Sequence, residues 1–140
     1  MSRFANLFQT IALISLSAFS GALLFIAVAI VKFWQSVEPN LFLSWMAANF
    51  FRFPTIMVPL NIASLLMAIV AIITSWKPYP DSRLPLSLGL ASLLFCTITF
   101  PIYFAEANEN FVSQSIVLDN VAQAIDTWSN WHWFRTGLAI

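Results

Sequence analysis

The side chains best suited to chemistry gather in residues 128–136, which read WSNWHWFRT. This stretch holds the only histidine, His132, together with Arg135 and three of the six tryptophans. A histidine can act as a general base near neutral pH, and an arginine can stabilise the anion that results. The flat apolar faces of the tryptophans suit the walls of a site for an aromatic molecule. If the stretch forms a site, its residue types predict proton abstraction from an aromatic substrate.

The spacing of these residues brings them together on one helix. If residues 115–140 form a single helix, with about 100° per residue, five side chains fall within an arc of about 120°. They are Asn120, Trp128, Trp131, His132 and Arg135. Trp128, His132 and Arg135 lie at positions i, i+4 and i+7, so these three share a face even if the helix is interrupted.

Two interpretations of this face remain open. Tryptophan and arginine are ordinary anchors at a membrane interface, and Arg135 could simply stack on Trp131. Alternatively, the face points inward, towards a cavity, where His132 and Arg135 act on a ligand. The elements around the face decide between the two.

The composition is that of an integral membrane protein. The 140 residues are 60% hydrophobic and 9% charged, whereas soluble domains carry about 25% charged residues. We treat residues 1–140 as a single transmembrane helical-bundle domain whose first partner is the lipid bilayer. The formal net charge is zero and there is no cluster of lysine and arginine, so the sequence predicts no nucleic-acid partner.

Three apolar segments are long enough to cross a bilayer, which takes roughly 20 residues. They are residues 10–31, 55–75 and 84–104. Pro101 is predicted to kink or end the third span. After the first span, Lys32 and Trp34 are predicted to anchor the helix at headgroup level.

Two shorter apolar runs complete the expected fold. Residues 41–53 are too short to span, and we expect a helix that lies in the interface or packs over the mouth of the bundle. Residues 137–140 begin another apolar run that is only a few residues long. The expected fold class is an all-α integral membrane protein, with three full spans, an interfacial helix, and a partial or truncated fourth helix.

The orientation in the membrane follows weakly from charge. Alternating spans place three basic residues on each side: Arg3, Lys77 and Arg83 on one, Lys32, Arg52 and Arg135 on the other. The positive-inside rule therefore gives no preference. We take the protein as multi-pass with a cytoplasmic N-terminus.

The sequence has few residues that could bind a metal ion. One histidine, one cysteine and scattered carboxylates do not supply a normal ligand set for a metal ion, so no metal site and no cofactor are predicted. Axial ligation of one haem or chlorophyll by His132 stays open. Cys96 reads as a small core residue. Asn61, inside the second span, is expected to hydrogen-bond a neighbouring helix, or to contact a ligand.

Residues 128–136 are similar to the W-x-x-W-H-x-x-R-T motif of the anthrone-oxygenase-like family of small four-helix membrane proteins, which are mostly of unknown function. Asn120 matches an asparagine that the family places before this motif. The resemblance implies a bundle of four transmembrane helices. In a few members it implies oxidation of an anthrone to an anthraquinone by O2 without an evident cofactor. The residues carried over are Asn120, Trp128, Trp131, His132 and Arg135.

Two functional hypotheses follow. The first, slightly favoured, is a non-enzymatic accessory subunit that packs in a larger membrane complex against other subunits, lipids or pigments. The alternative is a cofactor-free enzyme that oxidises a polycyclic phenol with O2. In that enzyme, His132 would abstract a proton and Arg135 would hold the anion, while Trp128 and Trp131 would line the ligand. Asn120 is the third candidate catalytic residue. An enzyme predicts these side chains around a cavity, and a subunit predicts them on an outer surface.

Overall fold

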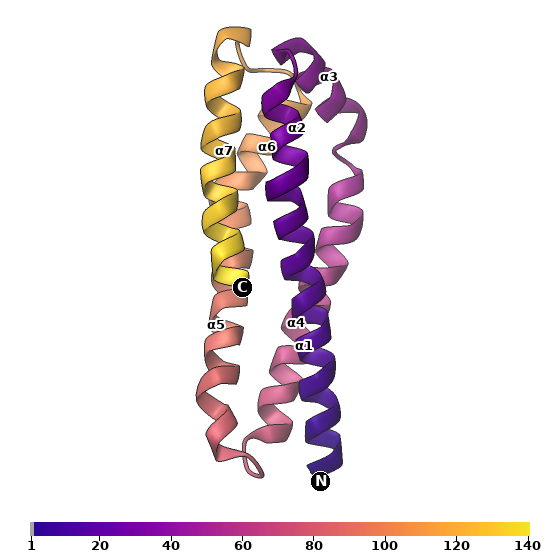
Figure 1. Ribbon diagram of the computed structural model, residues 1–140, viewed down its shortest axis with the longest axis vertical. Coiled ribbons are helices and arrows are strands. Elements are labelled where there is room, and N and C mark those ends of the chain that lie inside the picture. The colour runs from indigo at the N-terminus through magenta and orange to yellow at the C-terminus, as the bar shows by residue number, and fades with distance from the viewer. Residues whose placement is uncertain (1) are drawn as a thin grey trace.

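The computed structural model describes residues 2–140, and these residues form a long bundle of helices without a strand (Figure 1). The chain runs through α1 (Ser2–Phe25), the π-helical segment η1 (Ile26–Ile30), α2 (Val31–Ser36), α3 (Pro39–Asn49), α4 (Arg52–Ser75), the 3-10 turn η2 (Pro80–Ser82), α5 (Arg83–Thr99), the π-helical segment η3 (Phe100–Phe104), α6 (Ala105–Val112) and α7 (Leu118–Ala139).

Three continuous helices are long and apolar enough to cross a membrane, as the sequence predicts. They are Arg3–Ser36, Arg52–Ser75 and Pro80–Val112, each with an 18-residue stretch whose mean hydropathy is 2.4, 2.5 and 1.8, respectively. The first and third contain 34 and 33 residues, which is about 50 Å of helix at about 1.5 Å per residue. The hydrocarbon core of a bilayer is only about 30 Å thick. These two helices are therefore longer than the predicted spans and extend well beyond the hydrocarbon core.

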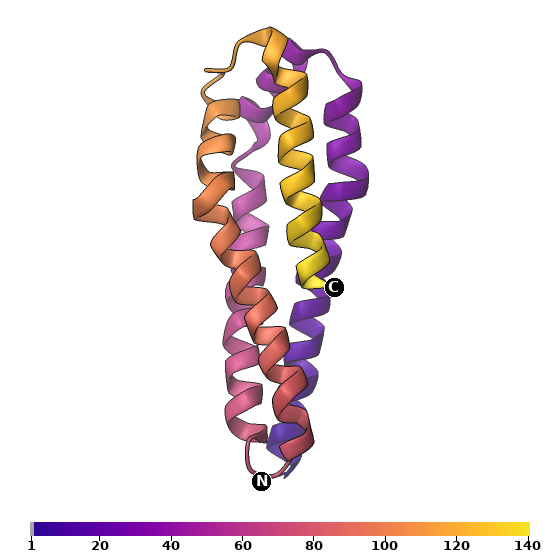
Figure 2. The same cartoon turned by 90° about the vertical axis from the view of Figure 1, so that its left-hand side faces the viewer.

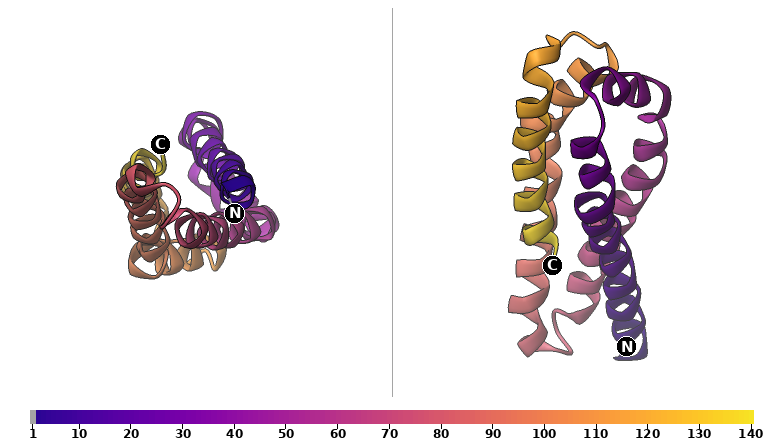
Figure 3. Two further views of the ribbon diagram at one scale, coloured as in Figure 1. Left: turned by 90° about the horizontal axis from the view of Figure 1, so that it is seen from below. Right: turned by 45° about the horizontal axis from the view of Figure 1, so that its top comes forward.

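The helices pack in a ring in which each has two neighbours. α1 packs on α4, α4 on α5, and α5 on α7, while α7 returns to contact α1 and α2. Figure 3 shows this arrangement along the long axis. α7 runs beside only the half of the bundle that lies away from the N-terminus (Figures 1 and 2). Among the described residues, that half of the bundle therefore has four helices and the other half has three.

Polar contacts fix the register between helices. Gln9 Nε2 donates to Ser75 Oγ at 2.8 Å, which sets α1 against α4. Asn61 Nδ2 donates to Thr97 Oγ1 at 3.0 Å, which sets α4 against α5 and confirms the expected contact with a neighbouring helix. Such bonds between buried or lipid-facing helices are worth roughly 0.6–2 kcal/mol each.

The short helix α3 packs over one end of the bundle, against α6 and α7. It begins with Pro39 in its first turn, where the missing N–H costs nothing. Phe42 and Met46 are fully buried beneath it, and the Phe42 ring meets Phe111 edge-on at 4.9 Å. The short apolar run predicted at residues 41–53 therefore forms the packed cover of the bundle.

The anchor prediction at the end of the first span is wrong for Trp34. The helix continues to Ser36, and Trp34 turns inward, where only 2% of it is exposed. Its ring meets Phe42 at 5.6 Å and Trp128 at 5.0 Å. Lys32 stays exposed, as expected.

Apolar side chains also cover the outside of the spans. Leu13, Ile73 and Phe95, one from each span, are 64–68% exposed. A surface of this kind suits lipid chains, because burying it removes apolar area from water.

Replacing Phe42 with alanine should lower the free energy of unfolding by about 3–5 kcal/mol, because the ring fills the core beneath α3. Phe95→Ala removes the same atoms from an exposed lipid-facing site and should cost far less. Reversible unfolding in mixed micelles of increasing dodecyl sulfate content would measure both. Equal losses in the two variants would contradict the packing of α3.

Candidate functional site

A cavity of about 420 Å³ lies inside the half of the bundle that has four helices. Its walls come from all three candidate spans and from α7. The lining is mostly apolar and largely aromatic; Trp34, Phe53, Phe104 and Trp128 belong to it. Small-molecule sites commonly measure about 300–1,000 Å³ and combine apolar walls with a few polar groups. The cavity fits this description.

Both π-helical segments contribute to the cavity wall. Ile26 comes from η1, while Phe100, Pro101 and Phe104 come from η3. Proline lacks an N–H and clashes with the preceding turn of a regular helix. The wider π turn takes up this clash, so the helix continues to Val112 and does not end near Pro101. Single π turns occur frequently at functional sites.

Arg135 is the cationic group of the cavity wall. One terminal N–H of its guanidinium, at Nη2, lies 2.8 Å from Nδ1 of His132, and Cζ lies 4.1 Å from the centre of the Phe104 ring. Its Nε is buried and has no hydrogen-bond partner among the described residues. An imidazole and an aromatic face stabilise a cation but carry no negative charge. Arg135 is half-buried in the wall of a bundle of apolar helices, and an ionisable residue in such a place is a candidate functional residue.

His132 lies directly behind Arg135 and is fully buried. Its Nε2 lies 2.9 Å from the Leu23 carbonyl oxygen, so Nε2 carries the proton and donates it. Its Nδ1 then accepts the hydrogen bond from Arg135. The imidazole is thus a neutral connector between α1 and the guanidinium, and both of its nitrogens have partners. Proton abstraction, or ligation of a haem or chlorophyll, would require one of these bonds to break.

Trp128 forms the part of the wall next to His132. Its ring stacks on the imidazole at 4.7 Å with an angle of 16° between the planes, and its Nε1 donates to Asn108 Oδ1 at 2.9 Å. Phe104 meets the same indole edge-on at 5.2 Å. Asn108 and Trp128 are both buried. The hydrogen bond fixes the indole plane, which in turn supports the histidine.

The five residues predicted for the site divide into two groups. Trp128, His132 and Arg135 come together as their spacing predicts. Trp131 is half-buried and stacks on Tyr103 of η3 at 5.0 Å. It does not line the cavity. Asn120 is exposed near the start of α7.

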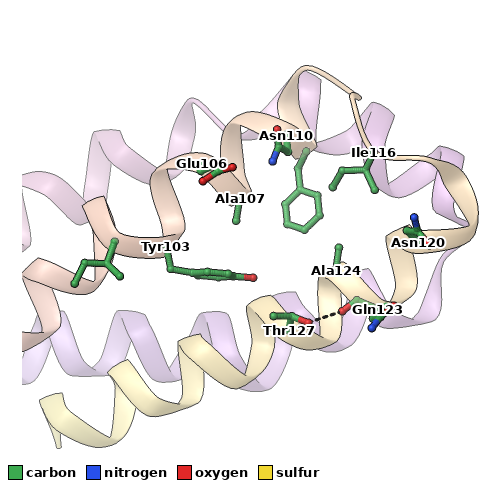
Figure 4. A pocket seen from close by; sticks show the side chains of 11 residues that line it. Tyr103, Glu106, Ala107, Asn110, Ile116, Asn120, Gln123, Ala124 and Thr127 are labelled. Atoms are coloured by element: carbon green, nitrogen blue, oxygen red, sulfur yellow. Dashed lines mark hydrogen bonds between the residues drawn. The ribbon is translucent and has the colours of Figure 1, made fainter.

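Asn120 lines a second, open hollow of about 530 Å³ between η3 and α6 on one side and α7 on the other (Figure 4). Glu106 and Gln123 face the same hollow, which is far more polar than the cavity beside Arg135. The hollow has neither the histidine nor the arginine among its lining residues. Asn120 is therefore separate from the predicted catalytic group.

The sequence predicts Trp34 as an interfacial anchor and does not single out Phe104 or Asn108. Asn108 carried a usable signal, because an asparagine three residues from a proline-containing apolar run is uncommon inside a membrane helix. Phe104 carried none, since 16% of the chain is aromatic.

Comparisons of the chain with protein-family models, curated proteins and solved structures found no match. The resemblance of residues 128–136 to the anthrone-oxygenase-like motif therefore stays a prediction. No group of three or more histidine, cysteine, aspartate and glutamate side chains able to hold a metal ion occurs in residues 2–140.

The hydrogen bonds of His132 can be read directly, because the chain has a single histidine. Nitrogen NMR of ¹⁵N-histidine-labelled protein in nanodiscs should show one imidazole with a protonated Nε2 and an unprotonated Nδ1. Replacing Arg135 with leucine should shift the Nδ1 signal, since it loses its donor, and leave the Nε2–H in place. A protonated Nδ1 in the wild-type protein would contradict the connector role.

Proposed function

We propose that the protein binds a lipophilic, largely aromatic molecule that carries an anionic oxygen, and that Arg135 holds this oxygen inside the bundle. The observation that carries the proposal is the guanidinium of Arg135 on the wall of an aromatic cavity, where its contacts leave its charge unbalanced. An anion that brings its own apolar body satisfies both the charge and the walls.

The lining also suggests how such a molecule enters. Val58 of α4 and Phe100 of η3 line the cavity and are 49% and 46% exposed. Both belong to candidate membrane spans, so their exposed sides face lipid. A ligand that partitions into the bilayer reaches Arg135 between α4 and η3 without passing through water.

The placement of the motif favours this proposal over the accessory-subunit hypothesis. That hypothesis needs the tryptophans and Arg135 on an outer surface for a partner to cover. Trp128 is instead buried, and Arg135 lines an internal cavity. The exposed apolar surface of the spans is accounted for by lipid.

Replacing Arg135 with glutamine should weaken binding of anthraquinone-2-carboxylate about 10- to 100-fold, the usual worth of a hydrogen bond to a charged group. Binding of uncharged anthraquinone should change little, because it makes no ionic contact. Equilibrium dialysis against protein in nanodiscs would measure both.

Arg83→Gln is the matched control, since Arg83 lies at the start of α5, at the end of the bundle away from the cavity. There its guanidinium donates to the Trp76 carbonyl oxygen and lies over the Trp76 ring. This variant should bind both ligands like the wild type. The proposal fails if Arg135→Gln binds the carboxylate as tightly as the wild type does.

A second candidate function is oxidation of a bound anthrone by O2. The Arg135 guanidinium on the cavity wall favours this reaction, because a guanidinium stabilises the phenolate form of an anthrone. The phenolate is the form that donates electrons to O2. The reaction balances as anthrone plus O2 giving anthraquinone plus water. One oxygen atom enters the ring carbon that loses two hydrogens, and the other leaves as water. Since both nitrogens of His132 are hydrogen-bonded, we assign it the positioning of Arg135. The substrate then loses its proton to water at the membrane surface, before it enters the bundle from the bilayer.

Anthrone oxidation should consume one O2 per molecule and should fall at least tenfold in Arg135→Gln, because the phenolate loses its partner. Oxygen-electrode traces combined with absorption of the anthraquinone product would measure this. Arg83→Gln serves again as the control. If the wild type oxidises anthrone no faster than empty nanodiscs, the oxidation is not its function, while the binding proposal stands on its own test.

A further inference from the structure

The open hollow that Asn120 lines is a second candidate site, separate from the cavity beside Arg135. It measures about 530 Å³ and lies between η3 and α6 on one side and α7 on the other (Figure 4). No residue lines both the hollow and the cavity. A ligand in the hollow therefore makes its contacts without the residues of the cavity.

The hollow lies where the apolar surface of the third span ends. The exposed apolar side chains of α5 and η3 run from Leu84 to Ile102, and α6 exposes no large hydrophobic side chain. Leu84 and Ile102 are about 27 Å apart along the helix, at about 1.5 Å per residue, which matches the roughly 30 Å thickness of the hydrocarbon core. Ile102 lines the hollow, and Glu106 lines it one turn later. The hollow therefore lies at the level of the lipid headgroups.

Glu106 is the only charged residue in the lining of the hollow. The other polar groups are three side-chain amides and two hydroxyls, from Asn110, Asn120, Gln123, Tyr103 and Thr127. Since the lining contains no basic residue, an anionic headgroup would find no cation there. A carboxylate surrounded by amide and hydroxyl oxygens instead suits a cation that donates several N–H bonds.

Tyr103 forms a fixed wall of the hollow. Its ring stacks on Trp131 at 5.0 Å with an angle of 11° between the planes, and its hydroxyl points into the hollow (Figure 4). Phe111, the other aromatic residue of the lining, is only 1% exposed. Quaternary ammonium groups are bound by cages of several aromatic faces, which this lining lacks. It favours a primary ammonium, because that group donates three hydrogens and a trimethylammonium donates none.

We propose that the hollow binds the headgroup of an ethanolamine phospholipid, with the primary ammonium on Glu106 and the phosphate accepting hydrogen bonds from the side-chain amides. The amides donate to the phosphate without adding charge, so the zwitterionic headgroup matches a lining with a single carboxylate. The acyl chains continue past Ile102, along the lipid-facing side of η3. This site is independent of the ligand proposed for the cavity.

Nanodiscs with equal amounts of ethanolamine and choline phospholipids of the same acyl chains test the proposal. Native mass spectrometry of the released protein should show the ethanolamine lipid retained roughly 2- to 5-fold over the choline lipid, the usual worth of an exposed ion pair. Glu106→Gln should retain both lipids equally, because it keeps the size of the side chain and removes its charge. Glu109→Gln, on the same helix but outside the lining, should keep the wild-type preference. A wild type without a preference, or a Glu106→Gln variant that keeps it, overturns the proposal.

Soluble glycerophosphoethanolamine distinguishes a lipid headgroup from a free amine. The bilayer holds its lipids at a high local concentration beside the hollow. The soluble headgroup, added at the same concentration as the lipid, should therefore leave the retained ethanolamine lipid unchanged. Displacement at that concentration would show that the hollow takes a soluble amine and would overturn the lipid assignment.

The two tyrosines of the chain give a readout that needs no variant. In ¹³C-tyrosine-labelled wild-type protein, exchange of choline for ethanolamine lipid should move the ring signals of Tyr103. Those of Tyr79 should stay in place, since Tyr79 lies in the turn between α4 and η2, at the other end of the bundle (Figure 1). Equal movement of both tyrosines would be a general response to the bilayer and would contradict binding in the hollow.

Discussion

The hydrogen bonds of His132 are the interaction on which the site depends. The imidazole connects the Leu23 carbonyl oxygen of α1 to the guanidinium of Arg135 on α7, and it does so with both ring nitrogens. These two hydrogen bonds fix the rotation of α7 about its own axis. That rotation places Trp128 on the cavity wall. A second contact one turn further along, from Ser20 Oγ to the Ala139 carbonyl, holds the same pair of helices together. The position of the charge therefore depends on His132, which together with Ser20 ties α7 to α1.

Holding a cation at this depth costs free energy, because apolar surroundings solvate charge poorly. The structure offsets part of this cost with the imidazole and with the face of Phe104, which is worth about 2 kcal/mol when the cation is desolvated. Neither contact neutralises the charge. A carboxylate on a neighbouring helix would neutralise the charge, yet the six acidic residues of the chain all lie outside the cavity lining. In the proposed function, this charge is balanced by the anionic oxygen of the ligand.

Much of the fold and part of the candidate site could be predicted from the sequence. Hydropathy and length identified the three spans, and the i, i+4, i+7 spacing brought Trp128, His132 and Arg135 together. The same projection failed for Asn120, because an angular position ignores distance along the axis. Asn120 lies 15 residues before Arg135, which is about 22 Å of helix. Trp34 was misplaced for a different reason: an aromatic residue after an apolar span resembles an interfacial anchor until the continuing helix and the cover formed by α3 are known. Which partner a helix face meets is a tertiary property, and one sequence without tertiary contacts does not specify it.

The shape of the cavity is fixed by rigid side chains. Trp34, Phe104 and Trp128 interlock edge to face, at 5.0–5.2 Å for the two contacts of Trp128, and aromatic rings have few alternative rotamers. Pro101 and the π turn around it shape the helix that carries Phe104. Rigid apolar walls beside a positioned cation are what the proposed aromatic anion requires, because such a ligand must fit the walls and the charge together.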